Sequence, residues 1–249
     1  MVCYVLVISL SASYFESWAT AAEGEQRAKA QRVYCEKEKH FRDEPKKPEP
    51  AWQFGRACFD LAEFATNSTE RALLAERGIN ACRQAVGIDA NSAPAHYYLG
   101  LNRGQLARTK SMGALKLVTQ MEGEFTIASE LDAKFDFGGP DRSLGLLYRD
   151  APSIISIGNR SKAKKHLGRA VELAPEHPEN RLDLIESYLK WGDRNEARRE
   201  LAGLEAIWPA AKAKLKGPDW TASWNDWQAR IEDLRKKIEE ASKLETPRH

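Results

Sequence analysis

The sequence predicts an all-helical fold: an array of about four helix hairpins in a row, followed by a tryptophan-rich helix that caps the array. Three observations support this prediction. Apolar residues recur at helical spacing from residue 51 onward, with almost no alternating β-branched runs. Short polar turns separate these segments, and one hairpin pattern recurs along the chain. Near the C-terminus, aromatic and aliphatic residues follow one helix face.

The first 21 residues have the features of a signal peptide. The apolar run from Met1 to Ala12 is too short to span a bilayer, which needs about 20 residues, and Ala19-Thr20-Ala21 fits a cleavage site. No Lys or Arg precedes the run, so an ordinary apolar N-terminal helix is the alternative. We therefore expect an exported protein, periplasmic or secreted in a bacterial envelope, without a stable membrane span.

Residues 22–50 are expected to form a charged helical arm followed by a linker. The segment from Glu23 to Arg42 contains no proline and is rich in charged residues. Pro45, Pro48 and Pro50 then follow closely, and each removes a backbone donor and restricts the residue before it. The main body is therefore expected to begin at residue 51.

The clearest hairpin lies between Pro178 and Pro209. Tyr188 on the first helix is followed by Gly192 at a turn and by Ala197 on the second helix. The glycine permits a tight reversal and the alanine allows a close helix crossing, which is the spacing of a tetratricopeptide repeat. Pro209 is expected to end the second helix.

Three earlier hairpins extend the repeat domain to residues 51–210. They pair 52–64 with 71–89, 95–101 with 115–131, and 141–149 with 161–175. The third hairpin contains a loop, residues 151–158, that is longer than a repeat turn requires, and long loops of this kind often carry function.

Residues 211–249 are predicted to contain the capping helix. Large apolar residues recur there at steps of three and four and share one helix face. This face consists of Trp220, Trp224, Trp227, Ile231, Leu234 and Ile238. So large an apolar stripe must be buried. It covers the end of the array or, alternatively, forms a seam with a partner.

The composition argues against several classes of function. The 38 basic and 36 acidic residues leave a net charge of +2, which supplies no single-sign field for nucleic acid or an acidic membrane face. The mean hydropathy of −0.57 is too low for a polytopic membrane protein. Nucleic acid is therefore not an expected partner.

No catalytic, metal-binding or cofactor-binding motif is present in the sequence. The five histidines are scattered at unrelated phases, and no cysteine pair has the spacing of metal ligands. We therefore expect no enzyme activity, no cofactor and no metal. Cys58 and Cys82 are expected to be either buried thiols or a disulfide between adjacent helices.

A protein partner is expected on the concave face, which the first helices of such arrays line. Arg142 and Arg149 lie two turns apart and could hold a carboxylate together, or could pair separately with nearby acidic residues. Ile154 and Ile155 in the long loop are candidate apolar contacts. The candidate binding residues are Tyr97, Leu101, Asn102, Arg142, Leu146, Arg149, Ile154, Ile155, Leu182 and Glu186.

Two segments resemble the T-component proteins associated with TRAP transporters, which are periplasmic tetratricopeptide-type proteins. The more specific segment runs from Phe137 to Pro152 and includes a Gly-Gly-Pro turn, a Leu-Gly pair and an Ala-Pro ending; the other runs from Ala170 to Asn180. The resemblance implies an interaction module beside an extracytoplasmic solute-binding protein, and a homo-oligomer. The alternative is a general scaffold for envelope protein assembly that binds a peptide or protein in its concave groove.

Overall fold

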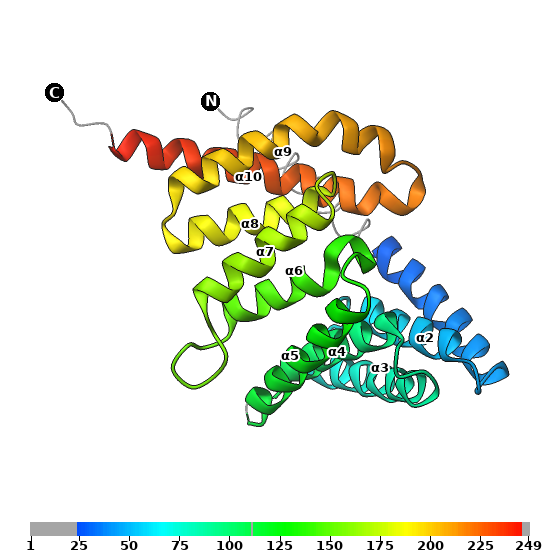
Figure 1. Cartoon of the computed structure of the whole chain (residues 1–249). Helices are drawn as coiled ribbons and strands as arrows, with labels where there is room; N and C mark the ends of the chain where they lie inside the picture. Colours follow the sequence, from blue (N-terminus) through cyan, green and yellow to red (C-terminus); the bar gives the residue numbers. More distant parts are fainter. Residues whose placement is uncertain (1–23, 111, 246–249) are drawn as a thin grey trace, which may run out of the picture. The chain divides into compact units, whose positions relative to one another are not determined.

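The computed structural model describes residues 24–110 and 112–245, with side chains up to residue 240, so the predicted signal peptide lies outside the described residues. Within these ranges the chain is helical with short connections and contains no strand, which confirms the predicted fold class (Figure 1). The chain divides into two compact units, residues 1–117 and 118–249.

The first unit contains a helix at residues 24–43, α2 (Pro48–Ala62), α3 (Ser68–Ile88) and α4 (Ala93–Ala107). The predicted hairpin of residues 52–64 and 71–89 corresponds to α2 and α3. Asn67 begins α3 by accepting a 2.8 Å hydrogen bond from the backbone N–H of Glu70. Ser92 caps α4 in the same way.

The helix of residues 24–43 belongs to the core of this unit. Its Tyr34 and Phe41 rings contact Phe54 of α2 with centroids 5.3 and 5.5 Å apart. Pro48 and Pro50 lie in the first turn of α2, where a missing N–H costs little. The proline-rich stretch is therefore a short turn between packed helices, where the sequence suggested a linker.

The hairpins of the first unit meet through very small residues. A side chain on Gly55 would collide with Cys82, and one on Gly78 would collide with Asn102. Asn102 is fully buried and donates hydrogen bonds to the carbonyls of Gly55 and Tyr98. Cys58 and Cys82 are both buried as thiols, and burial raises the pKa of Cys58 to about 12.

The division between the units falls within α5 (Ala114–Leu131). Residues 118–131 of this helix belong to the second unit and contact α6 (Phe135–Asp150). Ser129 donates a 2.7 Å hydrogen bond to Asp141, and the Tyr148 hydroxyl donates one of 2.6 Å to Glu122. These contacts hold this part of α5 against α6.

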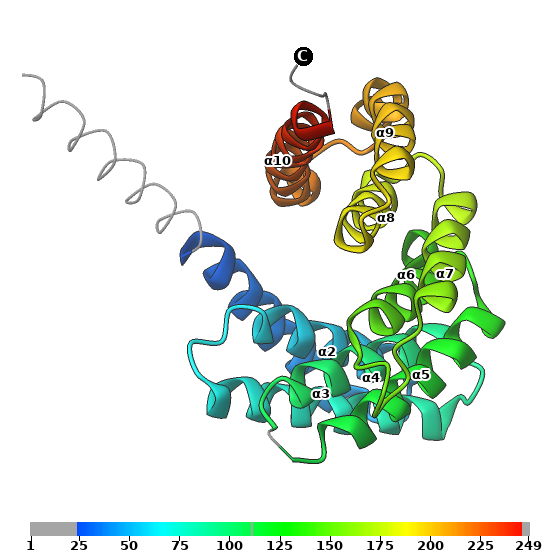
Figure 2. The same cartoon turned by 90° about the vertical axis from the view of Figure 1, so that its left-hand side faces the viewer.

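The remaining helices of the second unit form two hairpins and a final helix. They are α7 (Arg160–Leu173), α8 (Pro178–Trp191), α9 (Arg194–Lys214), the 3-10 turn η1 (Pro218–Trp220) and α10 (Thr221–Glu245). Helix α6 packs on α7 and α8 packs on α9, while α10 lies along α8 and α9 (Figure 2). Gly192 ends α8 in a left-handed conformation, as its place in the repeat predicts.

The prediction that Pro209 ends its helix is wrong. Helix α9 continues through Pro209 to Lys214. Ala211 and Leu215 beyond the proline are buried, so continuing the helix covers apolar groups that an earlier end would expose. This burial offsets the backbone hydrogen bond that proline cannot donate.

The apolar face of α10 packs into the second unit, as the tryptophan stripe predicts. Trp227, Ile231, Leu234 and Ile238 are buried in one core with the apolar residues of α8 and α9. Trp224 is partly buried, and its indole N–H donates to the Leu215 carbonyl over 2.7 Å. Helix α10 therefore acts as a cap on this unit.

Candidate functional site

The candidate residues predicted in α4 lie mostly inside the first unit. Tyr97 is buried edge-on against Tyr98, and Asn102 is enclosed by the backbone of α2 and α3. Leu101 is partly buried. These positions support helix packing, and a binding role for them stays a prediction.

Arg142 and Arg149 of α6 already have partners on their own unit. Arg142 donates to the Asp136 carboxylate over 3.0 Å and to the Asn180 side chain over 3.0 Å. Arg149 makes a bidentate contact with Asp150, at 2.9 and 2.7 Å. The two guanidinium groups thus hold different groups in this structure.

The remaining helical candidates, on α8 and α6, belong to the part of the second unit that packs with α10. Leu182 is buried, and Leu146 packs against the same apolar core. Glu186 accepts a 2.8 Å hydrogen bond from Arg230 of α10. The capping helix therefore engages part of the face that the sequence suggested for a partner.

Ile154 and Ile155 are the most accessible of the candidates. Their exposed fractions are 95% and 68%. The loop that carries them has a defined shape, because Gly158 donates to the Pro152 carbonyl and Asn159 donates to the Tyr148 carbonyl. Two apolar side chains are therefore exposed to solvent at one end of the α6–α7 hairpin.

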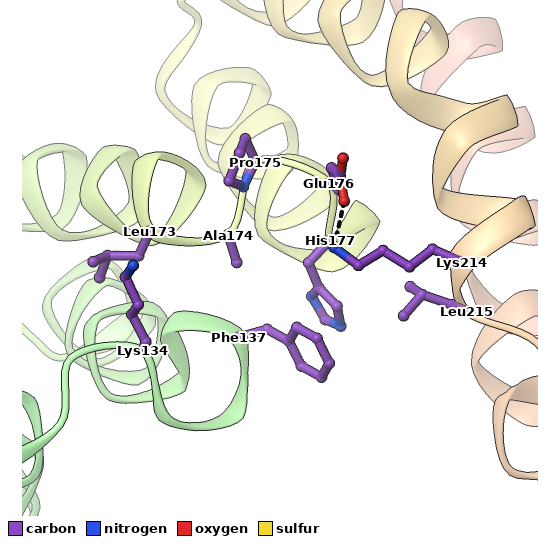
Figure 3. A pocket seen from close by; sticks show the side chains of 9 residues that line it. All are labelled: Lys134, Phe137, Leu173, Ala174, Pro175, Glu176, His177, Lys214 and Leu215. Carbon is purple, nitrogen blue, oxygen red and sulfur yellow. Dashed lines mark hydrogen bonds and ion pairs between the residues drawn. The ribbon is translucent and has the colours of Figure 1, made fainter.

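A pocket of about 330 Å³ lies at the opposite end of that hairpin. It is formed where the start of α6, the α7–α8 turn and the end of α9 meet, and Figure 3 shows Phe137 and His177 side by side within it. Its lining consists of Lys134, Phe137, Leu173, Ala174, Pro175, Glu176, His177, Lys214 and Leu215. Lys214 forms a 2.5 Å ion pair with Glu176 at the rim.

A left-handed turn places Phe137 in this pocket. Asp136, Phe137 and Gly138 have φ values of 49°, 57° and 78°, a conformation that costs about 1–2 kcal/mol for each residue with a side chain. Asn180 stabilises the turn by donating 2.9 Å hydrogen bonds to the carbonyls of Phe137 and Ala170. Arg142 fixes the Asp136 carboxylate. The pocket wall is therefore held rigidly.

His177 adds a neutral, largely buried ring to the charged groups that line the pocket. Its ring stacks on Phe137 at 4.4 Å between centroids and meets Trp227 edge-on at 5.3 Å. The side chain is only 4% exposed, and its Nδ1 has no hydrogen-bond partner among the described residues. Burial, assisted by Arg142, lowers the pKa of His177 to about 3, so the ring is neutral near pH 7.

The sequence did not single out Phe137, His177 and Asn180 as site residues. They do lie in the two segments, 137–152 and 170–180, that carry the family resemblance. The Gly-Gly-Pro turn was the available indication, because it marks a backbone conformation that a generic repeat does not need.

Two other kinds of site are absent from the described residues. These residues contain no group of three His, Cys, Asp or Glu side chains placed to hold a metal ion. Among them, no helix is both long and apolar enough to cross a membrane. The pocket at His177 is therefore the candidate site of the second unit.

Two family models match different parts of the chain. Residues 14–135 match the family described as regulator of microtubule dynamics protein 1-3, and residues 158–214 match a tetratricopeptide repeat. No curated protein matches the sequence.

Solved structures share the fold at low sequence identity. The tetratricopeptide protein TTC0263 of Thermus thermophilus is 17% identical, with 85% of this chain and 98% of that chain covered and a TM-score of 0.60. MamA is also 17% identical, with 76% and 95% covered and a TM-score of 0.52. These similarities establish the repeat fold.

Proposed function

We propose that this tetratricopeptide-type repeat chain is a non-catalytic interaction module that anchors a protein partner in the pocket at His177. The repeat match and the fold support protein–protein interaction as the general role. The single observation that carries the proposal is the pocket itself, in which apolar side chains such as Phe137 and Leu215 lie beside the charged groups of Lys134, Glu176 and Lys214.

The chemistry of the pocket favours a partner side chain that is aromatic with a polar tip. A volume of about 330 Å³ accommodates a tyrosine or tryptophan side chain. Phe137 and Leu215 offer apolar contact, and the charged groups of Lys134, Glu176 and Lys214 offer partners for a polar tip. Because Asn180 holds the wall in place, binding loses little conformational freedom.

Filling the pocket tests this proposal. Random peptides selected on the full chain should share one tyrosine or tryptophan at a fixed position. Ala174→Trp places an indole at the pocket wall and should weaken these peptides at least about tenfold, or 1.4 kcal/mol.

The matched control is Ala202→Trp on the exposed side of α9, which should leave the affinity unchanged. Peptides that lack a shared aromatic residue, or that bind both variants equally well, would contradict the proposal.

The resemblance to TRAP-associated T-components supports one specific partner, an extracytoplasmic solute-binding protein. The segment 137–152 that carries this resemblance also builds the left-handed turn and one pocket wall. In this proposal the chain is exported and acts in the periplasm. Purification of the chain from its native envelope, followed by mass spectrometry, should recover a solute-binding protein. Recovery of unrelated envelope proteins instead would favour the general assembly scaffold.

The match of residues 14–135 supports a second candidate partner, a cytoskeletal polymer, because the matching family is described by its regulation of microtubules. Co-sedimentation of the chain with polymerised tubulin tests this candidate. Binding should then survive Ala174→Trp, because the matched residues do not include the pocket side chains from Phe137 onward.

A further inference from the structure

The end of the second unit opposite the pocket combines apolar and basic groups. Ile154 and Ile155 are exposed in the middle of the loop between α6 and α7, which we call the tip. This loop extends past the helix ends in Figure 1. The shape of this tip is fixed close to the helices, because Gly158 lies against the Ala151 carbonyl without room for a side chain. The two isoleucines are therefore held in an exposed position.

The sequence that follows the tip is strongly basic. From Ala151 to Val171 there is no aspartate or glutamate. The same stretch contains five basic residues, Arg160, Lys162, Lys164, Lys165 and Arg169. The even charge balance of the whole chain, 38 basic against 36 acidic residues, therefore does not extend to this segment.

Carboxylates from neighbouring helices face the basic segment, and each is already paired. Asp150 contacts Arg149 and Lys190, both at 2.7 Å. On the other side, Asp193 contacts Arg160 at 2.5 Å.

Glu122 of α5 lies 3.7 Å from Lys162, and Asp141 lies 3.6 Å from Arg169. Lys164 lies over the Tyr188 ring, at 5.2 Å from its centroid. Among the described residues, no carboxylate oxygen lies within 4.0 Å of the ammonium groups of Lys164 and Lys165, whose charges remain available to an external anion.

Trp191 at the end of α8 adds an amphipathic group to the same edge. It is partly buried, and the Arg160 guanidinium lies 5.4 Å from its ring centroid. Tryptophan and basic side chains are both favoured where a protein meets lipid headgroups.

We infer that this edge, the tip at Ile154 and Ile155 together with the basic start of α7, docks the chain on an anionic lipid bilayer. The isoleucines would enter the boundary between headgroups and acyl chains, and Lys164 and Lys165 would meet lipid phosphates. A bilayer accepts an apolar tip and surrounding cations at once, whereas a nucleic acid backbone offers no place for two isoleucines. This inference is independent of the pocket, which lies at the other end of α6.

Vesicle co-sedimentation tests the inference with the full chain. The chain should sediment with vesicles of phosphatidylglycerol and phosphatidylcholine in equal parts, and should stay in solution with phosphatidylcholine alone. Raising the salt concentration should release it, because exposed charges are screened.

Two double variants measure separately how much the apolar tip and the lysine charges contribute to vesicle binding. Ile154→Asp with Ile155→Asp should lower the bound fraction at least about tenfold, because two carboxylates replace the inserted groups. Lys164→Gln with Lys165→Gln should weaken binding about fivefold for each lysine removed. Met112→Asp is the matched control: it removes an exposed apolar side chain outside this edge and should bind like the unaltered chain.

Equal sedimentation with neutral and anionic vesicles, or unchanged binding by both double variants, would overturn the inference. So would capture of an acidic protein through this edge in the absence of any vesicle binding. Loss of vesicle binding by the tip variant with retained peptide binding at the pocket would support the inference separately from the proposed function.

Discussion

The helices of the first unit meet through glycine, alanine and cysteine, whereas tryptophan, leucine and paired charges fill the space between α8, α9 and α10 of the second. Gly78 in the first unit touches Asn102 so closely that no methyl group fits between them. Trp227 in the second unit is one of the largest fully buried side chains. We therefore expect added atoms to damage the contact of Gly78 with Asn102, and removed atoms to damage the contact of α10 with α8 and α9.

Trp227→Ala should have the largest effect. It removes the centre of the apolar face by which α10 packs on α8, and we expect the free energy of unfolding of the second unit to fall by about 4 kcal/mol. Urea denaturation followed by circular dichroism measures this. Ile155→Ala in the exposed loop is the control and should change stability very little. A loss below about 1 kcal/mol for Trp227→Ala would show that α10 contributes little to the core.

Arg230→Met should follow, at about 3 kcal/mol, because it leaves the buried Asp183 without its partner. Burial already raises the pKa of Asp183, which Arg230 partly offsets. Arg235→Met on the same helix breaks an exposed pair with Glu205 and should cost about 1 kcal/mol or less. Equal losses for the two variants in thermal unfolding would contradict a special role for the buried pair.

Gly78→Ala should cost about 2 kcal/mol in the first unit, because the new methyl group would displace the buried Asn102 side chain. Gly87→Ala lies on the same helix in open space and should be neutral or stabilise the unit by about 0.5–1 kcal/mol. Chemical denaturation of both variants sharpens the comparison between the units. A neutral Gly78→Ala would show that the Asn102 side chain moves aside at no cost in stability.

The most gradual effect is a pH dependence of the second unit that comes from His177. The pKa of His177 is about 3 in the folded chain and about 6.5 when unfolded. As the pH falls from about 6.5 to 3, the unfolded chain therefore binds a proton that the folded chain does not. The free energy of unfolding of the second unit should therefore fall by at most about 1.4 kcal/mol for each unit by which the pH is lowered.

His177→Phe removes this contribution but leaves the carboxyl groups with raised pKa values, Glu179 and Asp183, in place. The difference between the variant and the unaltered chain, measured by urea titrations across this pH range, isolates His177. Parallel stability curves for the two proteins would contradict its burial as a neutral ring.

The helix hairpins and the cap could be predicted from the sequence because they follow from local patterns. Tyr188, Gly192 and Ala197 define a hairpin by their spacing alone, and the tryptophan stripe defines the buried face of α10. The continuation of α9 past Pro209 could not be predicted, because it depends on burial of Ala211 and Leu215 by other parts of the chain.

The site was less accessible to sequence reasoning for two physical reasons. The repeat geometry assigns Leu182 to a partner-facing helix, but whether its side chain is exposed depends on what packs there. The pocket needs Phe137 in a left-handed conformation, which is unfavourable for residues other than glycine. The distant Asn180 stabilises this conformation. Its histidine is buried by Trp227, 50 residues further along the chain.

The crowded indoles of the capping helix have an optical consequence. Of the seven tryptophans in the chain, five lie in the second unit, and the rings of Trp224 and Trp227 are 5.0 Å apart at an angle of 82°. Electronic transitions of rings this close couple, so the near-ultraviolet dichroism of the chain should be dominated by this one cluster. Because Trp220 and Trp227 also contact His177, the same spectrum offers a label-free report on an occupant of the pocket.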